Sequence, residues 1–169
     1  MKPKSVTNAV LIALEKFSAN PGRSGHSLSI KTAEKIFECR EKVAALFGCS
    51  HPENVVFTMN CTHALNCVIK GVLKKGDHVV VSDFEHNAVI RPLETLKRKG
   101  MITYDTATVS LTDNNVTLEN FKSCIKSNTK MIICTHASNV TGRVLPIREI
   151  GQLCKERKIL FTVDAAQSA

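Results

Sequence analysis

The sequence has no hydrophobic run that could cross a bilayer. Its apolar stretches, such as residues 159–163, are far shorter than the roughly 20 residues that a membrane-spanning helix needs. The N-terminal residues MKPKSVTNAV contain no apolar core followed by a small-residue cleavage site, so they do not indicate a secretory signal. We therefore expect a cytoplasmic protein with no membrane partner.

The seven cysteines include no CxxC pair and are odd in number, which argues against a disulfide framework. Mostly buried thiols in a reducing compartment fit this usage better. Cys61, His63 and Cys67 lie close in the sequence, but their spacing matches no common zinc module and a fourth ligand is not evident. Core packing with a polar turn is the favoured interpretation, and we expect no metal.

The sequence also lacks a GxGxxG motif and a Walker-type glycine loop, which counts against a dinucleotide or ATP site. The formal net charge of +8 raises the question of nucleic-acid binding. However, the 23 Lys and Arg residues are spread along predicted helices, and the densest cluster, at 97–99, falls at a helix end, where cations favour the helix dipole. We expect no nucleic-acid partner, and a basic surface would instead help to attract an anionic cofactor.

What the sequence does contain is a regular alternation of helical periodicity and short apolar runs. Predicted helices cover residues 5–17, 29–47, 62–73, 89–99, 118–126 and 147–157, and predicted strands cover residues 55–59, 78–82, 102–105, 131–135 and 159–163. Strands of near-continuous Val and Ile, separated by helices, predict an α/β fold. In this fold a mostly parallel sheet is covered by helices on both faces.

Several predicted helix ends carry local signals. Ser5 or Thr7 would cap the first helix, Gly48 ends the second, and Pro146 marks the start of the last. Between the first two helices, the segment NPGRSGH at 20–26 predicts a turn that no regular element would tolerate.

Polar residues follow four of the predicted strands. They are Asn60 and Thr62, then Asp83, Glu85 and His86, then His136, Ser138, Asn139 and Thr141, and finally Asp164 and Gln167. Taken alone, each group reads as an ordinary helix cap or a polar turn. Because the carboxyl ends of parallel strands meet at one rim, where ligands of open α/β sheets bind, we expect the groups to share a site. Asp164 would be partly buried there, either as a cap or holding a protonated nitrogen.

Five segments, in this order and spacing, resemble the class V aminotransferase family, and within it the cysteine desulfurase and selenocysteine lyase branch. They are NPGRSGH, NCTHALN, EHNAVIRP, HASNVTGRVLPI and VDAAQSA, and the resemblance runs from about residue 6 to residue 169. It implies the PLP-dependent transferase fold of type I. Residues 1–169 would then be an incomplete large domain that binds the cofactor, beginning with a helix and glycine-rich turn at 1–27, with the C-terminal part of the enzyme absent.

The resemblance also implies an activity. Members of this branch remove sulfur from L-cysteine and leave alanine and a persulfide on an enzyme cysteine. The implied cofactor is pyridoxal 5'-phosphate (PLP), and the implied substrate is L-cysteine or a related amino acid. The implied partners are a second copy of the chain in a full-length homodimer and a protein that accepts the sulfur.

Carried over position by position, the resemblance implies roles at both ends of the cofactor. Thr62 and the backbone around Cys61 would hold the phosphate. Asp164 would pair with the pyridinium nitrogen and keep it protonated, so that the ring accepts electrons. A charge-assisted bond of this kind at one end and a helix N-terminus at the other would fix the orientation of the cofactor.

The resemblance implies further contacts around the ring and substrate. His86 would stack on the ring and could relay protons. Gln167 would donate a hydrogen bond to the phenolic oxygen, with Asn139 beside it. Arg23 and His26 would lie near the substrate entrance.

The sequence departs from the family pattern at two of these positions. His63 stands where members often carry Glu, and Cys61 replaces a small residue, which favours a backbone role at that position. The lysine that bonds the cofactor and the cysteine that carries the persulfide belong to regions beyond Ala169. The chain also ends directly after a predicted core strand, so we expect a fragment that is inactive alone. The alternatives are another class V aminotransferase, a kynureninase-like enzyme, and a non-catalytic α/β binding module.

Overall fold

The computed structural model of the chain describes residues 2–22 and 25–169, and these form two compact units, Met1–Phe57 and Thr58–Ala169. Arg23, for which the resemblance implied a substrate role, lies outside the described residues. No helix in the described ranges is both long and apolar enough to span a membrane. The same ranges contain no group of three His, Cys, Asp or Glu side chains that could hold a metal ion.

The first unit consists of two helices and a short 3-10 turn. Helix α1 covers Lys4–Lys16, α2 covers Ser27–Leu46, and η1 covers Pro52–Asn54. The hydroxyl of Thr32 donates to the carbonyl oxygen of Phe17 at 3.0 Å, which joins α2 to the end of α1. The predicted cap at Ser5 or Thr7 is wrong, because α1 begins directly after Pro3 with no side-chain cap. Gly48 does follow α2, with a φ of 64° that favours glycine.

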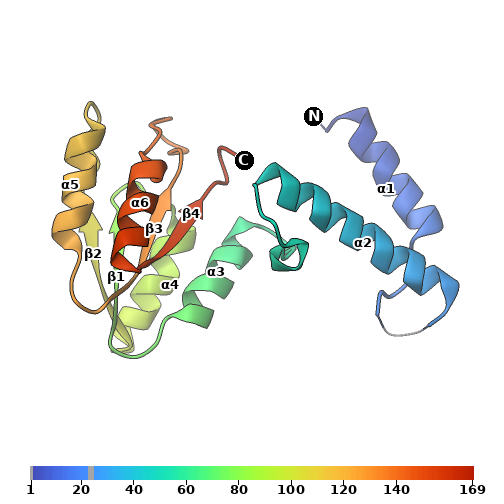
Figure 1. Ribbon diagram of the computed structural model, residues 1–169, viewed down its shortest axis with the longest axis horizontal. Coiled ribbons are helices and arrows are strands. Elements are labelled where there is room, and N and C mark those ends of the chain that lie inside the picture. Colours follow the sequence, from blue (N-terminus) through green and yellow to red (C-terminus); the bar gives the residue numbers. More distant parts are fainter. Residues whose placement is uncertain (1, 23–24) are drawn as a thin grey trace. The chain divides into compact units, whose positions relative to one another are not determined.

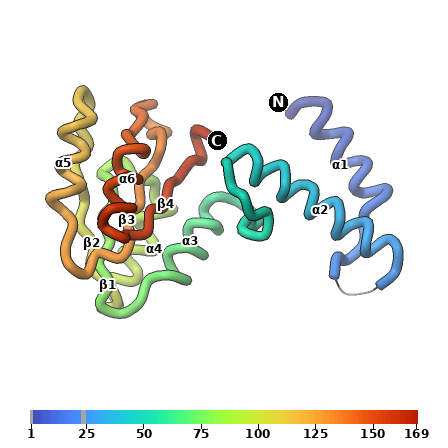
Figure 2. Tube along the Cα trace, in the orientation of Figure 1, coloured from blue at the N-terminus to red at the C-terminus, as the bar shows by residue number. Residues whose placement is uncertain are grey.

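The second unit is a four-stranded parallel sheet with two helices on each face (Figure 1). Its elements are α3 at Cys61–Val72, β1 at Asp77–Ser82, α4 at Asn87–Arg98, β2 at Ile102–Ala107, α5 at Asn114–Cys124, β3 at Thr129–Thr135, α6 at Ile147–Arg157 and β4 at Leu160–Asp164. The predicted α/β class, with a parallel sheet between helices, is confirmed. Figure 2 lets the reader follow the alternation of strand and helix along the chain.

Alternate residues of the central strands build two separate cores. Val79 and Val81 of β1 pack against α3 and α4 in one cluster, whereas Val80 belongs to a second cluster with α5 and α6. Phe121, on α5, is fully buried in that second cluster. Both faces of β1 and β3 are covered, which explains why these strands read as continuous apolar runs rather than alternating ones.

The predicted strand at 55–59 is wrong. Residues 55–58 adopt no regular structure, and the side chains of Val56 and Met59 are 73% and 86% exposed. A strand needs a neighbour for its backbone hydrogen bonds. The described sheet has the order β2-β1-β3-β4 and does not include this segment, so its backbone has no partner strand.

The strand order creates a switch point between β1 and β3. The chain goes from β1 to its neighbour on one side, β2, and then returns to the other side of β1 to form β3. Ligands of open α/β sheets bind at the carboxyl ends of the strands where the direction of winding reverses in this way. The fold therefore marks the region after Ser82 and Thr135 as the place to look for a site.

Candidate active site

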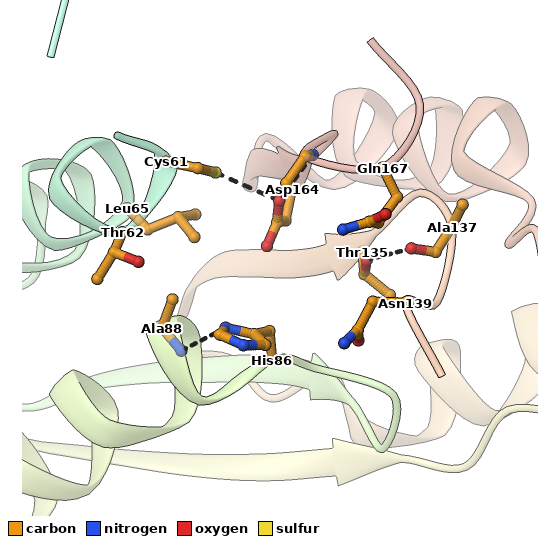
Figure 3. A pocket seen from close by; sticks show the side chains of 11 residues that line it. Cys61, Thr62, Leu65, His86, Ala88, Thr135, Ala137, Asn139, Asp164 and Gln167 are labelled. Carbon is orange, nitrogen blue, oxygen red and sulfur yellow. Dashed lines mark hydrogen bonds between the residues drawn. The ribbon is translucent and has the colours of Figure 1, made fainter. Parts of the chain in front are cut away.

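A pocket lies at the carboxyl ends of β1, β3 and β4, beside the start of α3 (Figure 3). It is lined by Cys61, Thr62, Leu65, His86, Ala88, Thr135, Ala137, Asn139, Asp164, Ala166 and Gln167. Its volume is about 150 Å³, which is comparable to engineered protein cavities that hold one benzene ring. All six positions to which the resemblance assigned cofactor contacts line this pocket.

Asp164 ends β4 inside the pocket and is only 6% exposed. Its Oδ1 atom accepts hydrogen bonds from the backbone N–H of Ala166 at 3.0 Å and from the thiol of Cys61 at 3.4 Å. Within the described residues, no lysine, arginine or histidine forms an ion pair with this carboxylate. The prediction of a largely buried carboxyl group is confirmed, and it remains open to a cationic ligand.

Helix α3 begins on the pocket wall next to Asp164, because its first residue, Cys61, contacts that carboxylate. Its N-cap is Asn60, whose Oδ1 atom accepts the N–H of His63 at 2.8 Å. Because the first amides of a helix have no acceptor in the preceding turn, the backbone N–H groups at Cys61 and Thr62 carry partial positive charge toward the end of the helix. The side chain of Thr62 lines the pocket at this end. Of the two predicted caps, Asn60 therefore takes the structural role and leaves Thr62 free for a ligand.

The thiol of Cys61 is held in its neutral form. Burial and the hydrogen bond to Asp164 together raise the pKa of Cys61 to about 11. A thiol with this pKa is almost entirely protonated near neutral pH and is a poor nucleophile. The geometry therefore supports a structural role for this side chain beside Asp164.

His86 lies on the pocket wall at the start of α4. It is the N-cap of that helix, and its Nδ1 atom accepts the backbone N–H of Ala88 at 3.1 Å. Asp83 does not cap this helix and instead accepts the N–H of Val109 at 3.0 Å. An Nδ1 acceptor places the ring proton of neutral His86 on Nε2.

The loop after β3 contributes one of its four predicted polar residues to the pocket, Asn139. Ser138 is buried and accepts the N–H groups of Val140 and Thr141, each at 3.3 Å, so it holds the loop together. His136 and the hydroxyl of Ser168 are 2.8 Å apart. This contact joins the loop to the segment that carries Gln167.

His26 belongs to the first unit, where its Nδ1 atom accepts the N–H of Ser29 at 3.2 Å and caps α2. Its proposed place near the substrate entrance stays a prediction.

Glu85 is the residue whose importance the sequence did not show. It was noticed only as a neighbour of His86, yet its Oε1 atom accepts the backbone N–H of Thr135 across the sheet at 2.7 Å. Thr135 itself also lines the pocket and was read only as the last residue of a strand. The available signal was an acidic residue between an apolar strand and a histidine, which by itself does not reveal a contact 50 residues away.

Comparisons with known proteins agree with this geometry. The family model for class V aminotransferases matches residues 1–169. A probable cysteine desulfurase of Methanothermobacter thermautotrophicus is 34% identical over 168 residues, covering 98% of this chain and 41% of the relative. Cysteine desulfurase IscS of Vibrio cholerae is 36% identical over 156 residues, covering 89% of this chain and 37% of the relative.

A solved structure is similar over the same region. The apo structure of a cysteine desulfurase from Thermococcus onnurineus NA1 superimposes with a TM-score of 0.88 at 31% identity. The match covers 99% of this chain and 42% of that one, so the chain spans about two fifths of the proteins that it resembles. With a family model that matches from the first residue to the last, the chain belongs to the class V aminotransferase family.

Proposed function

We propose that the chain forms the cofactor-binding part of a PLP-dependent cysteine desulfurase, which converts L-cysteine to L-alanine and passes the sulfur to an enzyme cysteine. One observation carries the proposal. A buried carboxylate, a helix N-terminus with a hydroxyl, and an imidazole line the same small pocket at the switch point of the sheet. The desulfurases among the relatives support the choice of reaction.

The residues present fit PLP. The pocket has room for one aromatic ring. Asp164 is buried without a cationic partner in the described residues, so a protonated ring nitrogen would complete its hydrogen bonding. The amides at the start of α3 and the hydroxyl of Thr62, which also lines the pocket, suit a phosphate dianion.

Each side chain would then have a defined task. When bound, PLP supplies an electron sink for carbanion chemistry at the amino acid. Asp164 would hold the nitrogen end and Thr62 the phosphate end, and Gln167 would donate to the phenolic oxygen with Asn139 beside it, since all four residues line the pocket. His86 would cover the ring and could hold or transfer a proton at Nε2, because its Nδ1 atom accepts the N–H of Ala88.

Two chemical groups of the reaction are proposed to come from outside residues 1–169. No lysine lines the pocket in the described part of the chain, and the pocket thiol, Cys61, is held protonated. The covalent lysine and the sulfur-carrying cysteine would therefore lie elsewhere in the enzyme. L-cysteine as substrate, a homodimer, a sulfur-acceptor protein and a cytoplasmic location are parts of the same proposal.

The 169-residue chain supplied with PLP and L-cysteine is expected to release no sulfide above the rate of free PLP. The pocket has the groups that orient a cofactor but neither of the groups that bond it covalently or accept sulfur. Sulfide would be measured by a colorimetric assay, with the Vibrio cholerae desulfurase as the positive control. Turnover by the chain alone would show that its own residues complete the reaction.

PLP is expected to bind the chain more tightly than pyridoxal, which lacks the phosphate. Replacing Thr62 with alanine should weaken PLP binding about tenfold, the size expected for one lost hydrogen bond to a charged group. Pyridoxal binding should be unchanged in the same variant. Both affinities would be measured by titration, following the absorbance of the ligand. Equal affinity for PLP and pyridoxal would rule out a phosphate site at α3 and overturn the proposed function.

A further inference from the structure

Glu85 connects two strand ends that are distant in the sequence. It lies in the turn after β1, three residues beyond Ser82, and precedes His86. Its Oε1 atom accepts the hydroxyl of Ser82, in β1, and the backbone N–H of Thr135, the last residue of β3. The parallel pairing of β1 with β3 has its last register pair at Val81 and Ile133, so this carboxyl group continues the connection beyond the ladder.

This connection reaches two walls of the pocket. On one side of Glu85, the chain continues into His86, which caps α4 and lines the pocket. On the other side, Thr135 is the register partner of Asp164 in β4, and both residues line the pocket. The Glu85 side chain therefore links the part of the pocket wall formed by His86 to the part formed by Thr135 and Asp164, across the switch point between β1 and β3.

The second oxygen of Glu85 is in an unusual environment. Oε2 is buried and has no hydrogen-bond partner within the described residues. A charged oxygen in this position would be costly, because no donor compensates for the lost water. Burial and, to a smaller extent, the negative charge of Asp164 raise the pKa of Glu85 to about 7, against the opposing effect of its two donors.

The charged and titratable groups around Glu85 offer no cation to offset a negative charge. From β4 it faces Asp164, and from β3 it faces the buried thiol of Cys134, whose pKa is raised by burial and by Glu85 itself. The titratable residues near it in the sequence are Asp83, which accepts a hydrogen bond from the N–H of Val109, and His86, which accepts one from the N–H of Ala88. The acid form, with its proton on Oε2, suits these surroundings better than the anion.

We propose that Glu85 is a positioning residue whose uncharged acid form ties the turn after β1 to the end of β3 and so holds His86 and Asp164 in place. The proposal rests on the proposed function only for the identity of the ligand. The proposal predicts that the length of this side chain and its acceptor oxygen are required to hold His86 and Asp164 in place, and that a negative charge on it is not.

The test compares Glu85→Gln with Glu85→Asp at pH 6. Glutamine keeps the length and an acceptor oxygen without a charge, whereas aspartate is one methylene too short to reach the same donor. The first readout is the hydrogen-exchange rate of the Thr135 amide by NMR. The second is the affinity for PLP by titration. Glu119→Gln serves as the control, because Glu119 is an exposed residue of α5 that pairs with Lys122.

We expect Glu85→Asp to accelerate exchange at Thr135 and to weaken PLP binding, each by about tenfold, as for one lost hydrogen bond. Glu85→Gln should stay within about twofold of the unmodified chain in both readouts, the range usual for a substitution that removes no interaction. Unchanged exchange at the core amides of Val80 and Ile132 would show that the fold is intact.

Two results would overturn the proposal. One is a hydrogen-exchange rate at Thr135 that does not change in Glu85→Asp. The other is a Glu85→Gln variant whose exchange rate at Thr135 and PLP affinity change as much as those of Glu85→Asp. If the unmodified chain binds no PLP at all, the proposed function fails, but the exchange rates still decide the role of Glu85.

Discussion

Replacing Asp164 with alanine is expected to weaken the binding of PLP by about 100-fold. The carboxylate is 6% exposed and is the acidic group that lines the pocket. Removing one partner of a buried charge pair costs about 2–5 kcal/mol, and about 3 kcal/mol corresponds to roughly two orders of magnitude in a dissociation constant. The measurement is a titration of the chain with PLP, followed by the absorbance of the cofactor.

Two further variants make this result specific. Asp164→Asn keeps an acceptor for the N–H of Ala166 but loses the charge, so it should fold normally and still bind PLP weakly. Asp105→Asn removes the carboxylate of a β2 residue that pairs with Lys126, and it should leave PLP affinity unchanged. If the alanine variant binds PLP as well as the unmodified chain, Asp164 does not face the cofactor and the proposed orientation is wrong.

The free energy of unfolding is expected to fall as the pH rises from about 4.5 to about 7, by about 3 kcal/mol from Glu85 alone. Its pKa is 4.5 in an unperturbed chain and about 7 in the folded protein. Below pH 4.5 both states hold the proton and the stabilisation is fully present. Between these values only the folded state holds it, so the contribution is lost as the pH rises through the folded pKa. A shift of this size at about 1.4 kcal/mol per pKa unit gives the expected magnitude.

The contribution of Glu85 is best isolated as a difference between two stability curves. Burial lowers the pKa of His78, so the stabilisation from that residue is lost as the pH falls below about 6.5, in the opposite direction. Urea unfolding of the unmodified chain and of Glu85→Gln, at several pH values, removes this and other shared effects. The two curves should diverge above pH 5, with the glutamine variant losing less stability. Parallel curves would mean that Glu85 does not take up a proton on folding.

Local sequence patterns were most reliable where local interactions decide the structure. The predicted helix at 147–157 has the observed limits, because Pro146 precedes it and its apolar face recurs at helical spacing. The limits of the central strands β1 and β3 were predicted to within two residues, because short continuous runs of Val and Ile are typical of strands buried on both faces. The same reasoning failed at residues 55–59, where an apolar run lacks a neighbouring strand and is largely exposed.

The sequence by itself determined the class of fold, most of its helices and strands, and the polar residues that follow four of the predicted strands. The resemblance of five short segments added the positions proposed to bind the cofactor. Only the tertiary structure decided the strand order that sets β1 beside β3 and brings those residues to one pocket. The contacts of Cys61 with Asp164 and of Glu85 with Thr135 join residues 103 and 50 positions apart. Such contacts depend on which strands pair, and hydrophobic periodicity within a segment carries no information about its neighbours in the sheet.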